Sequence, residues 1–132
     1  MKALLKIFTV LLIAAMTSFF IACSEDEPTK QEDPKNTVTG SWTGTVSIGG
    51  TITLNLNQSG TSVTGTGFVS AGSFNVACTV PSGTCNDPDV SLIIAIQGYQ
   101  DISYIGKFTA ANIHKGNLNG SGFTGEAITF VK

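Results

Sequence analysis

The sequence predicts an all-β domain, a small antiparallel eight-stranded up-and-down (meander) barrel. Three observations carry this prediction. Apolar and polar residues alternate with a period of two, turn signals separate the alternating runs at regular spacing, and no stretch after residue 22 has helical periodicity. Eight strands joined by tight turns can close on themselves and remove exposed edges. An open sandwich, the alternative, usually needs longer connections.

The alternation is clearest in residues 50–58, where Ile52, Leu54 and Leu56 alternate with threonine and asparagine. Turns rich in Gly, Ser, Asn or Pro bound this run and the others. Glycines within the strands of a small barrel permit coiling or leave room for a large side chain opposite. The expected strands are residues 40–48, 51–58, 62–70, 73–80, 89–97, 102–109, 113–119 and 123–131, with a long turn at 81–88.

The barrel domain is expected at residues 37–132, after two segments of different composition. Residues 1–22 combine Lys2 and Lys6 with an apolar run that is shorter than a membrane-spanning helix requires, which predicts a signal peptide. Residues 23–36 hold five acids and two lysines and have almost nothing apolar to bury, so we predict a flexible linker. All 15 glycines lie at or beyond Gly40, and this shift sets the boundary.

Cys23 stands at the junction of the apolar run and the acidic linker, in Phe20-Ile21-Ala22-Cys23. These four residues resemble the lipobox of bacterial lipoproteins, with Phe20 where leucine is usual. The resemblance implies cleavage before Cys23, lipidation of its thiol, and anchoring to a membrane through two or three acyl chains. A free or disulfide-bonded Cys23 behind an ordinary signal peptide is the alternative.

The acidic run Ser24-Glu25-Asp26-Glu27 resembles the export signal of some Gram-negative surface lipoproteins. It implies an outer membrane lipoprotein, on the periplasmic face or at the cell surface, although a charged solvated tether fits equally. From residue 37 on, the chain has three lysines, four acids and no arginine. Without a basic patch, nucleic acid is not an expected partner.

Gly40 and Trp42 open the first expected strand, and Lys132 follows the last. A Gly-x-Trp with a closing basic residue resembles the lipocalin and avidin group of small barrels. The resemblance implies that Trp42 plugs the barrel floor and that the Lys132 cation lies over its ring. It does not carry over a ligand site, because this chain has a single tryptophan. A filled core and a small cavity both remain open.

Cys78 and Cys85 bracket the turn that contains Pro81 and Gly83. In an exported chain such a pair is expected to form a disulfide across the turn. A metal site is the alternative, but no histidine lies nearby in the sequence. The following Asn86-Asp87-Pro88-Asp89 offers too few oxygen ligands for Ca²⁺, so we expect a solvated turn.

Catalytic groups are few. His114 is the single histidine, and its neighbours Ile113 and Lys115 predict that it faces solvent. The four acids from residue 37 on stand in no recognisable catalytic motif: Asp87, Asp89, Asp101 and Glu126. We therefore expect no enzyme, no catalytic residues, no metal and no cofactor. The hypothesis is a membrane-anchored binding module for a small apolar ligand or peptide; the alternative is a protein-interaction or inhibitor-type surface lipoprotein with a filled barrel.

Overall fold

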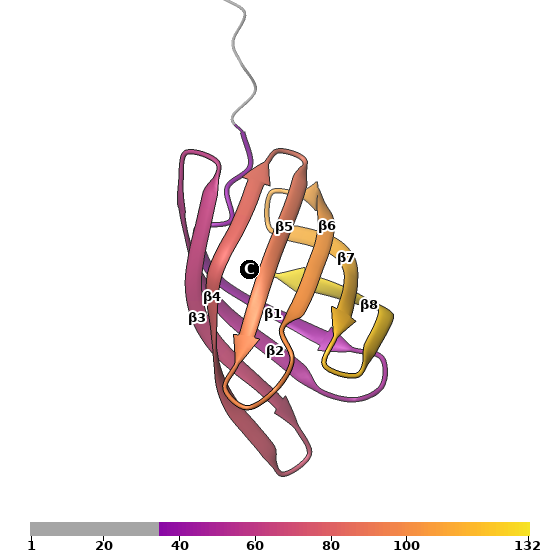
Figure 1. Ribbon diagram of the computed structural model, residues 1–132. Helices are drawn as coiled ribbons and strands as arrows, with labels where there is room; N and C mark the ends of the chain where they lie inside the picture. The colour runs from indigo at the N-terminus through magenta and orange to yellow at the C-terminus, as the bar shows by residue number, and fades with distance from the viewer. Residues whose placement is uncertain (1–34) are drawn as a thin grey trace, which may run out of the picture. The chain divides into compact units, whose positions relative to one another are not determined.

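The computed structural model describes residues 35–132, which form one compact unit. Its strands pair antiparallel in chain order, and the first pairs with the last, so the sheet closes into a barrel (Figure 1). The expected all-β, eight-stranded antiparallel barrel is thus confirmed. The strands are β1 (Gly40–Val46), β2 (Thr51–Ser59), β3 (Ser62–Ala71), β4 (Phe74–Asn86), β5 (Asp89–Ile96), β6 (Ile102–Ala110), β7 (Ile113–Gly120) and β8 (Phe123–Val131).

The seam between the first and last strands closes the barrel. Strand β1 pairs with β2 through Gly40–Thr45 and with β8 through Thr43–Val46. Its backbone is therefore hydrogen-bonded on both sides, which removes the exposed edge that an open sheet would present. Within the described residues no helix is long and apolar enough to span a bilayer.

Strand β4 is the main departure from the sequence-based expectation. It was expected to end at residue 80 but continues to Asn86, so the connection to β5 is only Asp87-Pro88. A shift in the β4–β5 register between Thr79 and Ser82 accommodates Pro81. A bulge tolerates proline because the bulged residue need not donate to the ladder. The predicted turn over residues 81–86 is therefore wrong.

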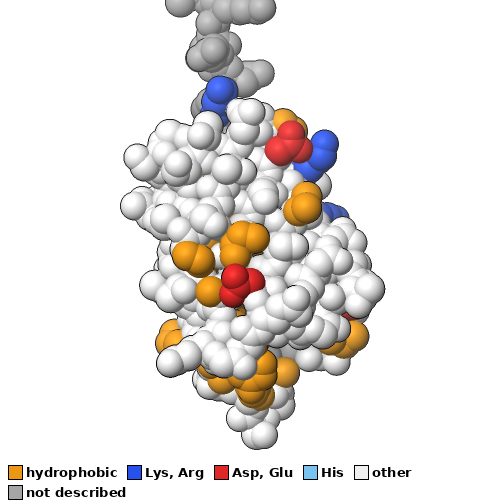
Figure 2. All heavy atoms as spheres, in the orientation of Figure 1, with side chains coloured by type: hydrophobic (Ala, Val, Ile, Leu, Met, Phe, Trp, Pro, Cys, Tyr) orange, Lys and Arg blue, Asp and Glu red, His pale blue; other side chains and the backbone are white. Residues whose placement is uncertain are grey.

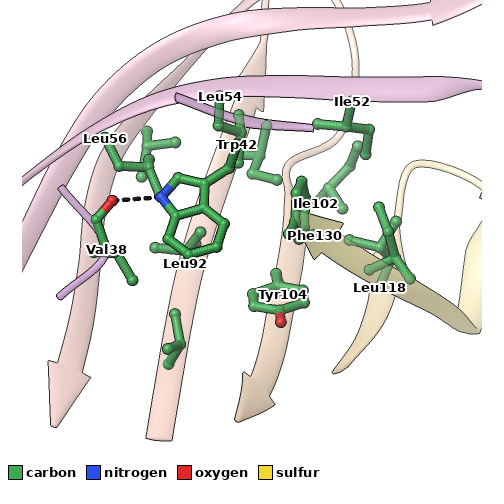
Figure 3. Packing of buried hydrophobic residues seen from close by; sticks show 14 of the residues in the cluster. Val38, Trp42, Ile52, Leu54, Leu56, Leu92, Ile102, Tyr104, Leu118 and Phe130 are labelled. Atoms are coloured by element: carbon green, nitrogen blue, oxygen red, sulfur yellow. Dashed lines mark hydrogen bonds between the residues drawn. The ribbon is translucent and has the colours of Figure 1, made fainter. Parts of the chain in front are cut away.

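Alternate residues of the strands point inward and fill the barrel (Figure 3). Inward-facing glycines make room for the largest of them. A Cβ on Gly44 would lie 2.9 Å or less from atoms of Ile128 and Phe130, and one on Gly106 would collide with the hydroxyl of Tyr104. The largest fully buried side chains include Trp42, Tyr104, Phe130, Ile52, Leu54, Leu92, Ile94, Ile102 and Leu118.

The barrel has two different ends. At the closed end lie residues 35–39, the β2–β3, β4–β5 and β6–β7 turns, and Lys132. At the opposite end, which we call the mouth, lie the other four connections. Figure 1 shows the described chain beginning at the upper end, while the β3–β4 and β5–β6 connections lie at the lower end. The described chain therefore begins at the end opposite to the mouth.

Candidate binding site at the mouth of the barrel

The closed end is organised around Trp42. Its side chain is fully buried, and its Nε1 donates a hydrogen bond of 2.6 Å to the carbonyl oxygen of Val38 (Figure 3). The Nζ of Lys132 lies 5.5 Å from the centroid of the Trp42 ring. A Cβ on Gly40 would lie 2.6 Å from Cε of Lys132, so glycine leaves the space that the lysine stem occupies. The structure thus brings together the three residues assigned to the barrel floor.

Residues 36–39 cover the interior next to Trp42. The backbone N and Nδ2 of Asn36 donate to the carboxylate of Asp87, at 3.0 and 3.1 Å. The backbone N of Val38 donates to Oε1 of Gln58 at 3.0 Å, and the Val38 side chain is fully buried. Because both side-chain and backbone hydrogen bonds fix this segment over the interior, it closes this end of the barrel to a ligand.

The two carboxylates of the β4–β5 turn have separate partners. Asp87 accepts the two hydrogen bonds from Asn36, and Asp89 forms an exposed ion pair of 3.2 Å with Lys107. Across residues 35–132 there is no group of three or more His, Cys, Asp or Glu side chains that could hold a metal ion. Asp87 therefore fixes the segment that precedes β1 through Asn36, a role that sequence reasoning missed.

His114 does not face solvent, and the prediction that it does is wrong. The side chain is fully buried, and its Nδ1 lies 2.6 Å from the hydroxyl of Tyr104. Its ring packs against Trp42, at 4.5 Å between centroids, and against Phe130, at 5.1 Å. The period-two pattern held the missed signal, because His114 lies on the inward face of β7 with Leu118. The pattern was not applied to His114 because histidine is a polar residue.

Burial sets the chemistry of the His114 and Tyr104 pair. It lowers the pKa of His114 to about 4 and raises that of Tyr104, because neither charged form is solvated inside the barrel. The Nε2 of His114 is also buried and has no hydrogen-bond partner among residues 35–132. Both side chains are fully buried and the histidine ring packs against aromatic rings, so the pair forms part of the core.

Cys78 and Cys85 are free, buried thiols, and the predicted disulfide between them is wrong. Both lie on β4, where Cys78 pairs with Ile96 and Cys85 with Val90. Six residues of strand lie between them, which places their Cα atoms roughly 20 Å apart, far beyond the reach of a disulfide. Burial raises the pKa of each thiol. The error follows from the turn placed between them, which is continuous strand.

The mouth differs from the closed end because it contains an apolar pocket. It holds an apolar pocket of about 160 Å³, lined mainly by Val69, Phe74, Ile96, Tyr99, Ile102 and Phe123. The rings of Phe74 and Tyr99 meet edge to face, 5.7 Å between centroids, and Tyr99 is 54% exposed. Figure 2 shows hydrophobic side chains gathered at the lower end of the molecule. This pocket is the candidate binding site.

Sequence reasoning did not locate this pocket, although a signal was present. Phe74, Tyr99 and Phe123 each stand at or beside a turn of the predicted meander. Alternate turns of a meander lie at the same end of a barrel, so aromatics beside the β3–β4, β5–β6 and β7–β8 turns must converge. Their exposure could not be read from the pattern, because it depends on how far each loop folds inward.

Cys23, the residue predicted to carry the lipid, lies outside the described residues, as do the predicted signal peptide and nearly all of the linker. In comparisons with known proteins, no family model matches the chain, and no curated protein or solved structure matches it either.

Proposed function

We propose that this chain is a non-catalytic binding module that takes one benzene-sized apolar group, carried by a small ligand or a short peptide, into the mouth of its barrel. The observation that carries the proposal is the apolar pocket of about 160 Å³ at the mouth. An apolar cavity of about 150 Å³ is large enough to bind benzene. The pocket therefore matches a single aromatic or branched aliphatic group.

The size of the pocket disfavours a long lipid or a polycyclic ligand. Pockets for drug-sized ligands measure roughly 300 to 1,000 Å³. The interior of this barrel, where a lipocalin-like ligand would lie, is filled by large buried side chains that include Trp42, Tyr104 and Phe130. An occupant can therefore enter only the outer layer of the barrel, between the loops.

The free energy available from the pocket favours a peptide or protein over a free small molecule. Burying one Phe- or Leu-sized group contributes about 1.5–3 kcal/mol, whereas even millimolar affinity requires about 4 kcal/mol. A specific partner must therefore make further contacts around the rim, as a polypeptide presenting one apolar side chain would. The same reasoning supports the second candidate function, a protein-interaction or inhibitor-type module with a filled barrel.

The sequence supports the other half of the proposal, that the barrel is carried on a membrane as a lipoprotein. Cys23 and its lipobox-like flanks would supply the anchor, and residues 23–36 the tether. Because the described chain begins at the closed end, a tether that precedes it would attach there and leave the mouth free. A test is Cys23→Ser, which should release the protein from the membrane fraction. Retention of this variant, with no lipid mass on the N-terminal peptide of the wild type, would contradict the anchor.

The mouth is tested by binding short peptides to the full-length chain in detergent micelles. We expect a peptide with a central phenylalanine to shift the NMR signals of residues around Phe74 and Tyr99, and its alanine counterpart to leave them unchanged. Val69→Phe, which fills the pocket, should abolish the shifts. The matched control is Ile105→Ala, a 65% exposed residue on the outside of β6. Equal shifts with both peptides would overturn the proposal.

A further inference from the structure

The outer surface of β1–β4 is uncharged. From Asn36 to Asn86 the chain contains no Asp, Glu, Lys, Arg or His, so every charged residue of the described barrel strands lies on β5–β8. The outward positions of β2, β3 and β4 are mostly hydroxyl and amide side chains. They include Thr51, Thr53, Asn55, Asn57, Thr64, Thr66, Ser70, Asn75 and Thr79. We call this surface the neutral face.

Phe68 is the aromatic residue at the centre of the neutral face. It is 54% exposed, although a phenylalanine gains free energy from burial. Its cross-strand partners are Thr53 on β2 and Ala77 on β4. Along its own strand, the residues on the same side are Thr66 and Ser70. The ring is thus a single apolar platform flanked by the hydroxyl side chains of Thr53, Thr66 and Ser70 and by the methyl group of Ala77.

A groove runs beside this platform, between β4 and β5. Its volume is about 360 Å³, and it is lined by Ala77, Cys78, Thr79, Ala95, Ile96 and Gln97. Ala77 and Ala95 keep the groove open because their side chains are short. Thr79 and Gln97 bring a hydroxyl and an amide. Since directly opposed side chains lie about 5 Å apart, the Phe68 ring stands at the edge of the groove, next to Ala77.

We propose that the neutral face binds an uncharged glycan, with one sugar ring stacked on Phe68 and the chain continuing along the β4–β5 groove. The C–H face of a sugar ring carries partial positive charge and is attracted to the negative face of an aromatic ring. Hydroxyl and amide side chains can donate to and accept from sugar hydroxyls. The groove volume lies within the range of small-ligand sites.

The lack of charge is what selects this class of ligand. An anionic or cationic polymer is attracted by side chains of opposite sign, and the neutral face has none. A second copy of the chain or another protein is the competing occupant. The core of a protein interface is enriched in aromatic residues and methionine and depleted in serine, whereas this face surrounds one phenylalanine with Thr, Ser and Asn. The composition therefore favours a polyhydroxylated partner.

The test is affinity gel electrophoresis of the full-length chain, in a polyoxyethylene detergent because a glycoside detergent would compete. Neutral glucan, mannan, galactan and xylan gels are compared with gels containing alginate or polygalacturonate. We expect at least one neutral polysaccharide, and neither charged one, to retard the protein. Phe68→Ala should weaken binding about tenfold or more, as loss of a central aromatic contact does at other interfaces, and Phe68→Tyr should retain it.

Controls separate this site from the mouth and from misfolding. Ile105→Ala removes an exposed side chain from the outside of β6, and Tyr99→Ala removes one from the mouth pocket; both should bind the polysaccharide as the wild type does. Circular dichroism and the urea midpoint should show that Phe68→Ala is folded. A groove variant, Ala95→Leu, should weaken binding while leaving Phe68 in place.

Three results would overturn the proposal. The first is mobility that no neutral polysaccharide changes. The second is equal retardation of the wild type and Phe68→Ala. The third is a dimer in sedimentation that Phe68→Ala dissolves, without any binding of glycan, which would make the occupant a second copy of the chain. These results are separable from the pocket at the mouth, because the peptide experiment reports on signals around Phe74 and Tyr99, and Ile96 is the one residue that lines both the groove and the pocket.

Discussion

The two ends of the barrel use similar aromatic residues in opposite ways. At the closed end Trp42, Phe108, His114 and Phe130 pack ring against ring, and the segment from Asn36 to Thr39 is hydrogen-bonded over them. At the mouth Phe74, Tyr99 and Phe123 surround a pocket, and Tyr99 is 54% exposed. The aromatic side chains of the closed end are covered, whereas the mouth keeps apolar surface in contact with water.

This difference predicts which end contributes most to stability and at which end a partner would bind. Complete packing with paired polar groups contributes to the free energy of folding, but it leaves nothing for a partner. Exposed aromatic side chains contribute less to folding and can still be buried by a partner. Substitutions at the closed end should therefore lower the free energy of unfolding, and substitutions at the mouth should change binding with little effect on unfolding.

The largest expected effect comes from the closed end. Trp42→Ala should lower the free energy of unfolding by about 3–5 kcal/mol, because it removes a fully buried indole and leaves a cavity. Urea denaturation followed by circular dichroism measures it. The matched substitution at the mouth, Tyr99→Ala, should cost less than about 1 kcal/mol. Equal losses for the two variants would remove the distinction between the ends.

A pH titration tests the same cluster. The pKa of His114 is about 4 in the folded protein and about 6.5 in the unfolded chain. Between these values the unfolded state binds more protons, so stability is fully present above pH 6.5 and falls as the pH decreases toward 4. The total loss from this one group is about 3 kcal/mol.

The control for this titration is His114→Phe, which keeps a ring in the cluster and removes the titrating group. Its unfolding free energy should depend less on pH over the same window, while the contributions of exposed carboxylates remain in both proteins. The quantity to compare is the slope between pH 4.5 and 6. Identical slopes in the two proteins would mean that His114 is accessible to protons in the folded state.

The His114 pair shows how far sequence patterns reach in this protein. The period-two alternation predicted all eight strands, and it also places His114 inward once β7 is recognised. The prediction that His114 faces solvent followed the residue type instead, because histidine lies more often on the polar surface than in the core. The compensating features, the Tyr104 hydroxyl and the space left by Gly106, lie on another strand. Pairing across strands depends on register, which a single sequence does not display.

Strand β4 illustrates a second limit. Pro81 and Gly83 are turn residues by local preference, and a turn would have brought Cys78 and Cys85 together. The barrel instead uses a bulge, which absorbs the proline and extends the strand to Asn86. The choice between turn and bulge depends on pairing with β5, a nonlocal interaction. The mouth pocket escaped prediction for a related reason, since loop conformation decides which aromatics are covered.

Removing the hydroxyl of Tyr104 should have an intermediate effect. Tyr104→Phe leaves Nδ1 of His114 buried without its partner, in addition to the unpaired Nε2, and should cost about 1–3 kcal/mol. The matched change at the mouth, Tyr99→Phe, removes an exposed hydroxyl and should be neutral within about 0.5 kcal/mol. Thermal and urea unfolding of both variants provides the measurement. If Tyr104→Phe were as stable as the wild type, the hydrogen bond to His114 would make no net contribution to stability.

The smallest expected effect distinguishes charge from packing at the barrel floor. Lys132 is exposed, with its Nζ 5.5 Å from the centroid of the Trp42 ring, a geometry that contributes about 0.5–1 kcal/mol at such sites. Lys132→Met keeps an unbranched stem over Gly40 and removes the cation, so it should lose about this amount. Lys132→Arg should lose less, and Lys115→Met, on the outside of β7, should be neutral. If Lys132→Met were as stable as the wild type while Lys132→Gly were not, the stem would be what stabilises the floor, and the closed end would then depend on apolar packing alone.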